Sequence, residues 1–552
     1  MLAFPSTYSV GITSLGFQVV WATLARRSDV DVRRLFTDQG DPPHGGQRGR
    51  GPDLDLFGLS LSWELDGPVL LDLLEQQRIP LWASERGDQH PIVFGGGPVL
   101  TANPEPLAPF FDAVLLGDGE LLLPAFIDAL QACRSAPRAQ RLRQLAQVPG
   151  VYVPSLYAPR YGGEGQLLAV EPIEAGIPET VAKQTWRGNT LSHSTVITPE
   201  AAWPSIHMVE VVRSCPELCR FCLASYLTLP FRTPSLDDGL IPAVEAGLGA
   251  TQRLGLLGAS VTQHPQFGDL LQWLDQDRFE STRVSVSSVR AATVTPELGR
   301  ILAKRGSKSL TIAIESGSDR MRQVVNKKLS GDEIFAAARY AKEGGLSGLK
   351  LYGMVGLPSE TEADVEATAE LLLALKKATP GLRLSLGVST FVPKAHTPFQ
   401  WHSVSTAEFQ RRQRLLRDAL RPLRGIKTNT TDVRLSAMED FVGRGDRRLA
   451  PVIEAAWRAG AGLDAWFEAA ERTYGAWTSA IEAAGLGGRY RELELGEWSA
   501  AEGMEAADLE AFCRQPLPWD HIDSGVDKAW LAEDLQRALA AAVVPDCSFE
   551  GC

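Results

Sequence analysis

Apolar runs of strand length alternate with longer segments of helical spacing through much of the chain. In the first 150 residues the strand-like runs are LAFPSTYSV, DLFGLSLSW, PIVFGGG and DAVLLGD, and a segment such as LGFQVVWATLARR has helical spacing. Continuous apolar runs separated by helices are typical of strands that are buried on both faces of a parallel sheet. The pattern therefore predicts an α/β fold with an open parallel sheet over residues 1–150.

The alternation becomes regular between residues 206 and 392. Six apolar segments there have strand length, namely IHMVEVVR, RLGLLGAS, TRVSVSSV, SLTIAIES, GLKLYGMVGL and RLSLGVSTFV. Helix start signals accompany several of the intervening segments: Thr295-Pro296 and the capping boxes Ser330…Glu333 and Ser359…Glu362. Six consecutive βα units predict a six-stranded partial (β/α)6 TIM barrel over residues 201–400, with its chemistry at the carboxyl ends of the strands.

The segments around these two units have other compositions. Residues 38–53 are a Gly/Pro/Asp loop, and residues 151–200 are poorly periodic, so we expect a connector with little regular structure there. From residue 401 onward the chain is rich in Ala, Arg and Trp at helical spacing. This pattern predicts a mainly helical C-terminal domain over residues 401–552.

Composition and charge limit the classes of partner and compartment. The chain has 552 residues, of which 44% are apolar, and a net charge of −12. No run of about 18 apolar residues is free of charge or proline, so no membrane span is predicted. The amino terminus has no basic residue before its apolar part, which speaks against a secretory signal, and we expect a cytoplasmic protein. The acidic balance does not favour nucleic acid, DNA least of all, although a local basic groove can hide in that average.

Three of the seven cysteines, Cys215, Cys219 and Cys222, lie directly after the first predicted barrel strand. Three thiolates can bind three irons of a four-iron cluster and leave the fourth iron open to another ligand. The alternatives are a zinc site completed by a distant ligand, for which His207 is the nearest candidate, or three buried core thiols. The isolated Cys133 and Cys513 are expected to be core thiols, and the pair Cys547 and Cys552 is either part of a second cluster or a disordered tail.

The spacing C-x3-C-x2-C, with the aromatic Phe221 before the third cysteine, resembles the signature of the radical S-adenosylmethionine (SAM) enzymes. The resemblance implies a 4Fe-4S cluster on Cys215, Cys219 and Cys222 whose open iron binds the amino and carboxylate groups of SAM. It also implies that one electron, from a reductant such as flavodoxin or ferredoxin, cleaves SAM to methionine and a 5′-deoxyadenosyl radical.

Residues at the ends of the later strands fit the same resemblance in order. Gly258 ends the second strand, where the family's glycine-rich turn binds the SAM amino group, although the usual Gly-Gly-Glu is absent. The family's carboxylate, ribose and adenine contacts fall on the ends of strands three to five, which here carry Ser288 and Arg290, Glu315 and Ser316, and Tyr352 and Gly356. The alternative for a strand-end glutamate is a solvated or capping role.

Residues 1–150 resemble the Rossmann-like cobalamin-binding domain that precedes the barrel in one branch of this family. The resemblance is carried by Ser60 in a Ser-Leu-Ser turn, by Gly95 and Gly96 in a Gly-Gly-Gly turn, and by DAVLLGDGE. The usual D-x-H-x-x-G, whose histidine ligates cobalt, does not occur, because the loop after the first strand reads STYSVGITSLGFQ. Two alternatives stay open: cobalamin bound without a protein lower ligand, or a retained fold that has lost the cofactor.

A closer resemblance covers nearly the whole chain. Strings such as ESGSDRMRQVVNKKLSGDEI, KLYGMVGLPSETEADV, STFVPKAHTPFQW, RGDRRLAPVI and LPWDHIDSGVDKAWL resemble a subfamily of uncharacterised radical SAM proteins whose substrate is unassigned. Such relatives extend further at both ends, so we expect this chain to be shortened. Within these strings, Lys394 and His396 follow the sixth strand and are predicted catalytic residues, with Gln400 also facing substrate. The alternative is a Pro-bounded loop that packs its aromatic residues in the core.

The leading hypothesis is a radical SAM enzyme, in one version a cobalamin-assisted methyltransferase, acting on an unknown small molecule, protein or RNA. One alternative is a methylthiotransferase-like modification of RNA or a ribosomal protein, for which no RNA-binding appendage is visible after the barrel. The other is a non-catalytic iron-sulfur protein that binds a partner or relays electrons. It predicts a cluster that takes no SAM.

Overall fold

The structure is a computed structural model, and it describes residues 1–41, 54–422, 425–463, 470–496 and 504–547. Most of the loop predicted at 38–53, and Cys552, lie outside the described residues. No helix in the described part of the chain is long and apolar enough to cross a membrane.

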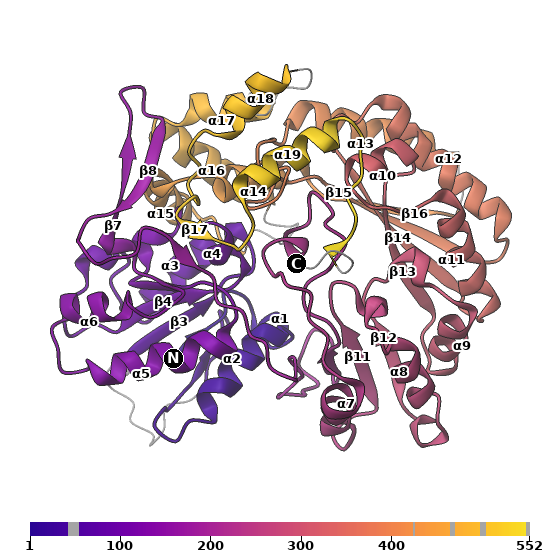
Figure 1. Cartoon of the computed structure of the whole chain (residues 1–552), viewed down its shortest axis with the longest axis horizontal. Helices are drawn as coiled ribbons and strands as arrows, with labels where there is room; N and C mark the ends of the chain where they lie inside the picture. Colours follow the sequence, from indigo (N-terminus) through magenta and orange to yellow (C-terminus); the bar gives the residue numbers. More distant parts are fainter. Residues whose placement is uncertain (42–53, 423–424, 464–469, 497–503, 548–552) are drawn as a thin grey trace.

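The N-terminal part is a six-stranded sheet with helices packed against it (Figure 1). All neighbouring strands are parallel except the last pair, and the strands in spatial order are β2 (Arg34–Leu35), β1 (Leu2–Ala3), β3 (Leu56–Ser60), β4 (Ile92–Gly96), β5 (Ala113–Leu115) and β6 (Val151–Tyr152). Its principal helices are α2 (Leu15–Ala25), α3 (Gly67–Gln76), α4 (Pro98–Ala102), α5 (Gly119–Ala132) and α6 (Arg138–Leu145). The predicted α/β fold with an open parallel sheet is confirmed.

The six predicted barrel strands all form and are parallel to their neighbours. They are β10 (His207–Glu210), β11 (Arg253–Leu257), β12 (Arg283–Val286), β13 (Ser309–Glu315), β14 (Gly348–Val355) and β15 (Arg383–Thr390). A parallel bridge between Val289 and Ile312 joins the first three strands to the last three. Beyond the predicted boundary at 400, β16 (Lys427–Thr430) adds a seventh parallel strand at the edge. The partial barrel is therefore confirmed and is one strand wider than predicted.

Helices cover the outside of the barrel strands in the order expected for βα units (Figure 1). They are α7 (Ile241–Leu248), α8 (Phe267–Leu274), α9 (Pro296–Lys304), α10 (Asp319–Val324), α11 (Gly331–Glu343), α12 (Glu362–Ala378) and α13 (Thr406–Leu420). The Thr295 cap and the Ser330 capping box form as predicted. The Ser359 box is wrong, because Thr361 caps α12 and pairs with Asp364, while Ser359 takes a left-handed turn with φ of 60°.

The connector and the C-terminal part differ in how well they were predicted. Residues 151–200 hold a hairpin of β7 (Tyr157–Tyr161) and β8 (Leu167–Pro172), so the expectation of little regular structure was wrong. The next strand, β9 (Val181–Ala182), pairs with β17 (Ile522–Asp523). The remaining C-terminal elements are helical, namely α14 (Val433–Gly443), α15 (Ala450–Arg458), α16 (Ala470–Ala483), α17 (Gly487–Leu495), α18 (Ala506–Cys513) and α19 (Lys528–Leu539).

The C-terminal helices lie along the upper side of Figure 1, above the sheet on the left and the barrel on the right. They share one hydrophobic core with the N-terminal sheet: Leu70 of α3 and Ile453 of α15, for example, belong to the same buried cluster. The barrel has a separate core between its strands and its helices. The C-terminal helices therefore bind the two halves into one framework, within which the domain boundaries remain a prediction.

Candidate functional site

The three clustered cysteines lie on a loop that follows β10 at the carboxyl end of the barrel. All three are free thiols; Cys215 and Cys219 are buried and Cys222 is partly buried. Burial raises the pKa of Cys215 to about 11, with a smaller contribution from Cys222, and burial raises the pKa of Cys219 further. Thiolates at these positions therefore need a cation beside them, which the irons of a bound cluster supply.

The backbone of this cysteine loop is held in an unusual path. Ser214 and Leu218 have left-handed φ values of 72° and 53°. The amide of buried Asn326 donates to the carbonyl oxygens of Glu217 and Leu218 at 3.2 and 3.1 Å, and the hydroxyl of Tyr226 donates to Leu218 at 3.0 Å. Side chains from outside the loop thus fix the backbone that carries the thiols.

The geometry also bears on the zinc alternative. Among the described residues, no three Cys, His, Asp or Glu side chains converge as ligands of a single metal ion. His207, the nearest candidate, donates its ring nitrogen to the carbonyl oxygen of Ala243 at 2.7 Å instead. A four-iron cluster places each cysteine on a different iron atom, so three free thiols on one loop fit that group.

Two residues predicted at the ends of β11 and β12 lie against the cysteine loop. Gly258 has φ of 151°, and a Cβ atom there would lie 2.7 Å from the carbonyl oxygen of Val212, so the position requires glycine. Arg290 pairs with the carboxylate of Glu217 at 2.6 Å and donates to the carbonyl oxygen of Lys328 at 2.7 Å. Ser288 is partly buried beside them.

Glu315, predicted at the end of β13, pairs with Lys327 at 2.8 Å. Burial by itself lowers the pKa of a lysine, but the charges of Glu315 and Cys219 outweigh it and raise the pKa of Lys327. A fixed positive charge therefore stands beside the thiols. The hydroxyl of neighbouring Ser316 accepts a hydrogen bond from the backbone N–H of Ser318.

Of the residues predicted on β14, Gly356 directly follows the strand at the same end of the barrel, whereas Tyr352 lies within the strand. Tyr352 is 48% exposed, and Gly356 donates its N–H to Glu360 at 2.8 Å. Burial raises the pKa of Glu360 to about 7. Apart from Tyr352, which lies within β14, the strand-end residues named from the sequence therefore lie at the carboxyl ends of their strands, and their contacts with SAM stay a prediction.

A cavity of about 490 Å³ lies between the N-terminal sheet and the barrel. Ser60 and Gly96, predicted for cobalamin, and Gly258, predicted for SAM, all line it, whereas Gly95 packs against Leu100 and Phe111 inside the sheet. The turn after β4 needs Gly97, because φ is 105° and a Cβ atom would lie 2.3 Å from the carbonyl oxygen of Leu61. No histidine is among the residues that line this cavity.

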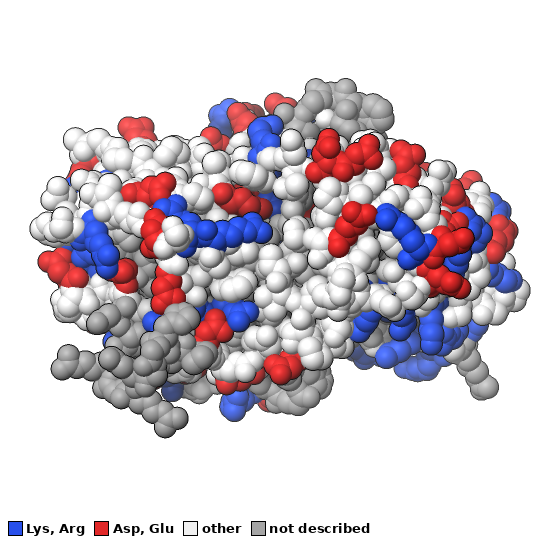
Figure 2. Space-filling view, turned by 90° about the horizontal axis from the view of Figure 1, so that it is seen from below, with Lys and Arg blue, Asp and Glu red and all other residues white. Residues whose placement is uncertain are grey.

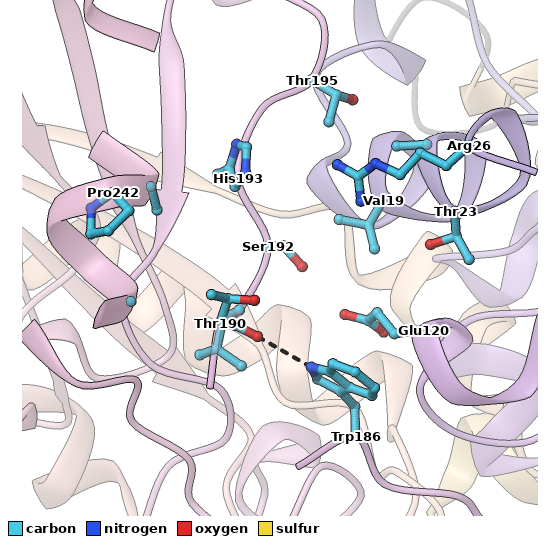
Figure 3. Close-up of a pocket in the computed structure, with 14 residues that line it drawn as sticks. Val19, Thr23, Arg26, Glu120, Trp186, Thr190, Ser192, His193, Thr195 and Pro242 are labelled. Carbon is cyan, nitrogen blue, oxygen red and sulfur yellow. Dashed lines mark hydrogen bonds between the residues drawn. The ribbon is translucent and has the colours of Figure 1, made fainter. Parts of the chain in front are cut away.

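A second cavity of about 400 Å³ adjoins the first, with which it shares Val19, Glu120 and Ser192 (Figure 3). The connector forms one wall, where the indole of Trp186 donates to the carbonyl oxygen of Thr190 at 3.1 Å. His193 also lines this cavity. No local pattern in the sequence predicts this wall, because residues 151–200 lack a clear period.

An ion-pair network spans the first cavity and reaches the cysteine loop. Arg213, two residues before Cys215, pairs with Asp118 at 3.1 Å and with Glu120 at 2.8 Å at the start of α5. It also pairs with Glu210 of β10 at 2.7 Å. The network ties the N-terminal sheet directly to the backbone that leads into the cysteine loop.

The predicted catalytic residues Lys394 and His396 lie where the loop after β15 meets the N-terminal sheet and the C-terminal helices. Lys394 pairs with Glu64 at 2.5 Å and with Glu439 at 2.7 Å. The ring of buried His396 donates to the carbonyl oxygen of Ala102 at 3.0 Å. Both residues therefore have structural contacts, and their catalytic role stays a prediction.

His396 gives a testable pH dependence. Burial lowers the pKa of His396 to about 4, so the ring is neutral when folded, whereas the unfolded chain binds a proton below about 6.5. The stability that neutral His396 contributes is present above pH 6.5 and falls by about 3 kcal/mol as the pH drops to 4. In thermal unfolding followed from pH 7 to 4, His396→Gln is expected to lose less stability than the wild type. The partly exposed His90→Gln is the control, and equal pH slopes in His396→Gln and the wild type would contradict the expectation.

Exposed basic residues mark the opposite end of the barrel. They lie at or near the starts of the strands and are Arg253, Arg283, Lys308, Lys350, Arg383 and Lys427. In Figure 2, Lys and Arg side chains gather along one edge of the barrel half, while the rest of the visible face mixes both charges. This acidic chain therefore has a local basic surface. The basic residues at the strand starts lie at the amino end of the barrel, whereas the cysteine loop lies at its carboxyl end.

The barrel with three thiols on the loop after its first strand agrees with the resemblance to radical SAM enzymes drawn from the sequence. The sequence model of the N-terminal domain of radical SAM proteins matches residues 16–154, and the model of the radical SAM superfamily matches residues 209–372. The chain therefore contains the two domains of radical SAM proteins that these models describe. These domains imply a 4Fe-4S cluster and SAM as cofactors, and the three free thiols fit the cluster.

Two curated relatives are similar over different lengths. An uncharacterized protein of Methanocaldococcus jannaschii is 26% identical over 454 residues, which cover 82% of this chain and 90% of that protein. A tRNA-2-methylthio-N(6)-dimethylallyladenosine synthase of Anaplasma marginale is 28% identical over 183 residues, which cover 31% of this chain and 40% of the synthase.

Among solved structures, the radical SAM methyltransferase TsrM from Kitasatospora setae, with cobalamin and a [4Fe-4S] cluster bound, is similar in fold. The TM-score is 0.50 at 15% sequence identity, and the match covers 72% of this chain and 76% of that chain. The shared fold agrees with the α/β sheet and partial barrel described above.

Proposed function

We propose that this protein is a radical SAM enzyme that cleaves SAM reductively and, with cobalamin in the cavity between sheet and barrel, transfers a methyl group to a substrate. The observation that carries the proposal is that one cavity is lined by Ser60 and Gly96 of the N-terminal sheet and by Gly258 of the barrel. A cofactor held by the sheet would then lie beside the site predicted for SAM.

Each cofactor supplies one part of the chemistry when bound. When bound, a reduced four-iron cluster would supply the electron for cleavage of the S–C5′ bond of SAM into methionine and a 5′-deoxyadenosyl radical, and cobalamin would supply a carrier for a methyl group. The electron would come from an external one-electron donor such as a flavodoxin or a ferredoxin.

The chain's own residues would position these groups. Cys215, Cys219 and Cys222 would hold the cluster, and the positive charge of Lys327 would offset its negative charge. Gly97 has no side chain at the turn that lines the first cavity, and this would leave room there for cobalamin. The missing lower-ligand histidine is consistent with a cobalamin held by the cavity walls alone.

The test is anaerobic reconstitution with iron and sulfide, followed by addition of SAM, dithionite and cobalamin. We expect bound cobalamin, 5′-deoxyadenosine and S-adenosylhomocysteine, the last because a methyl group taken from SAM leaves that product. Deoxyadenosine without bound cobalamin would support the radical chemistry and contradict the methyl transfer. A reducible cluster that yields neither nucleoside would contradict both and favour a non-catalytic iron-sulfur protein.

The turn after β4 provides a specific prediction for cobalamin. Gly97→Ala places a Cβ against the carbonyl oxygen of Leu61 in a conformation that alanine rarely adopts, so the turn must move. We expect cobalamin to bind about tenfold more weakly, measured by absorbance after desalting. Gly163→Ala, where a Cβ meets no atom within 4 Å, is the matched control. Equal cobalamin retention in the two variants would contradict a cobalamin site at this turn.

A further inference from the structure

Arg220 lies within the cysteine loop, between Cys219 and Cys222, and its side chain is fully buried. Its guanidinium forms a two-point ion pair with Asp534 of α19, in which Nε and Nη2 each donate to a carboxylate oxygen at 2.9 Å. Neither side chain has any exposed surface. The other three N–H groups donate to backbone carbonyl oxygens, those of Gln323, Val324 and Ala542. All five donors of Arg220 therefore have acceptors.

The segment after α19 makes two further contacts with the same region. The N–H of Val544 donates to the side-chain oxygen of Asn326 at 3.0 Å, and that side chain also holds the backbone of the cysteine loop. The N–H of Cys547 donates to the carbonyl oxygen of Pro216 at 3.0 Å. In Figure 1 the yellow end of the described chain runs from α19 down to the middle of the molecule.

Stability alone is a poor explanation for this arrangement. Burying two charges costs desolvation that the attraction between them repays only in good geometry, and well-packed apolar pairs are often as stable. In metal sites, groups that orient the ligands tune metal affinity and electronic properties without touching the metal. Arg220 lies next to one thiol in sequence and two residues from another, and it fixes the backbone between them.

We infer that Arg220 and Asp534 are positioning residues for the cluster, so that α19 and the segment after it form part of the cluster site. The inference rests on the proposed function, because it requires that the cysteine loop binds a four-iron cluster. It assigns the C-terminal helix, more than 300 residues away in sequence, a role in holding Cys219 and Cys222 at the spacing that the cluster requires.

The experiment compares the wild type with Arg220→Met/Asp534→Leu, which removes both charges together, and with the milder Asp534→Asn. Arg305→Met is the matched control, because Arg305 is also buried and donates to three backbone carbonyls away from the cysteine loop. Each protein is reconstituted anaerobically with iron and sulfide. The readouts are iron per chain, the electron paramagnetic resonance spectrum of the reduced cluster with and without SAM, its midpoint potential, and the thermal unfolding midpoint of the unreconstituted chain.

We expect the double variant to bind iron about tenfold more weakly, or to show a shifted spectrum and potential, while unfolding near the wild-type temperature. Asp534→Asn should change the same readouts in the same direction by less. If both variants load a cluster with the wild-type spectrum and potential, the inference is overturned. It is also overturned if the variants lose iron only in proportion to their loss of thermal stability, with the same ratio of lost iron to lost stability as in Arg305→Met. A wild type that takes up no cluster would overturn the proposed function, and the inference with it.

Discussion

Cys219→Ser is expected to reduce 5′-deoxyadenosine formation by the reconstituted protein to background, and to prevent assembly of an intact four-iron cluster. Cys219 is buried and shares its loop with two further free thiols, and a hydroxyl is a poor ligand for these irons. The measurement is anaerobic turnover of SAM with dithionite, with iron and sulfide determined in the same sample.

The control for this substitution is Cys133→Ser. Cys133 is also a buried free thiol, but it lies at the end of α5 in the N-terminal sheet and is not part of the cysteine loop. It should keep both the cluster and the turnover. Deoxyadenosine formation that survives in Cys219→Ser would contradict the assignment of this thiol to the cluster.

The fold was largely predictable because its signals are local. Six apolar segments of strand length, separated by helical spacing, correspond to β10–β15, and the Thr295 cap and Ser330 box mark real helix starts. Two elements with a polar or irregular sequence were not predicted. Strand β16 reads KTNT and has no apolar run, and the hairpin of β7 and β8 interrupts its pattern with prolines.

The site was predictable only as far as it follows strand ends. The cysteine spacing and the residues after each strand could be placed from the sequence, because parallel strands bring their carboxyl ends together. The pairing of Arg220 with Asp534 joins positions 314 residues apart, and no local pattern indicates it. Asn326 and Lys327 were also missed, because they follow helix α10 and the βα pattern points only to residues at strand ends.

His396 and Lys394 were placed correctly at the carboxyl end of the barrel, while their catalytic role stays a prediction. The loop after β15 does lie at the carboxyl end of the barrel, as the βα pattern predicts. The N-terminal sheet and the C-terminal helices also pack against this end, so Lys394 and His396 bond to protein groups there, and His396 also lines a cavity of about 320 Å³ with Gln400 and Trp519. A loop at a barrel mouth can therefore serve the contact between domains instead of the reaction.

Lys394→Met is expected to destabilise the folded chain by about 3 kcal/mol, because it leaves two largely buried carboxylates without their shared cation. Burial lowers the pKa of a lysine, yet Glu439 and Glu64 outweigh this effect and raise the pKa of Lys394, which therefore stays charged. The measurement is the midpoint of thermal or denaturant unfolding. Exposed Lys350→Met serves as the control and should unfold like the wild type.

Neutralising the partners separates a structural role of Lys394 from a catalytic one. In Lys394→Met/Glu64→Gln/Glu439→Gln no unpaired charge remains, so most of the lost stability should return. The indole of Trp63, which donates to Glu439 at 2.7 Å, keeps an acceptor in the glutamine side-chain oxygen. If Lys394→Met unfolds like the wild type but loses turnover, the ion pairs are not what Lys394 contributes, and its predicted role in catalysis gains support. The other outcome is that Lys394→Met loses stability and the triple variant regains both stability and turnover. That result would assign Lys394 to the framework that joins the N-terminal sheet, the barrel and the C-terminal helices.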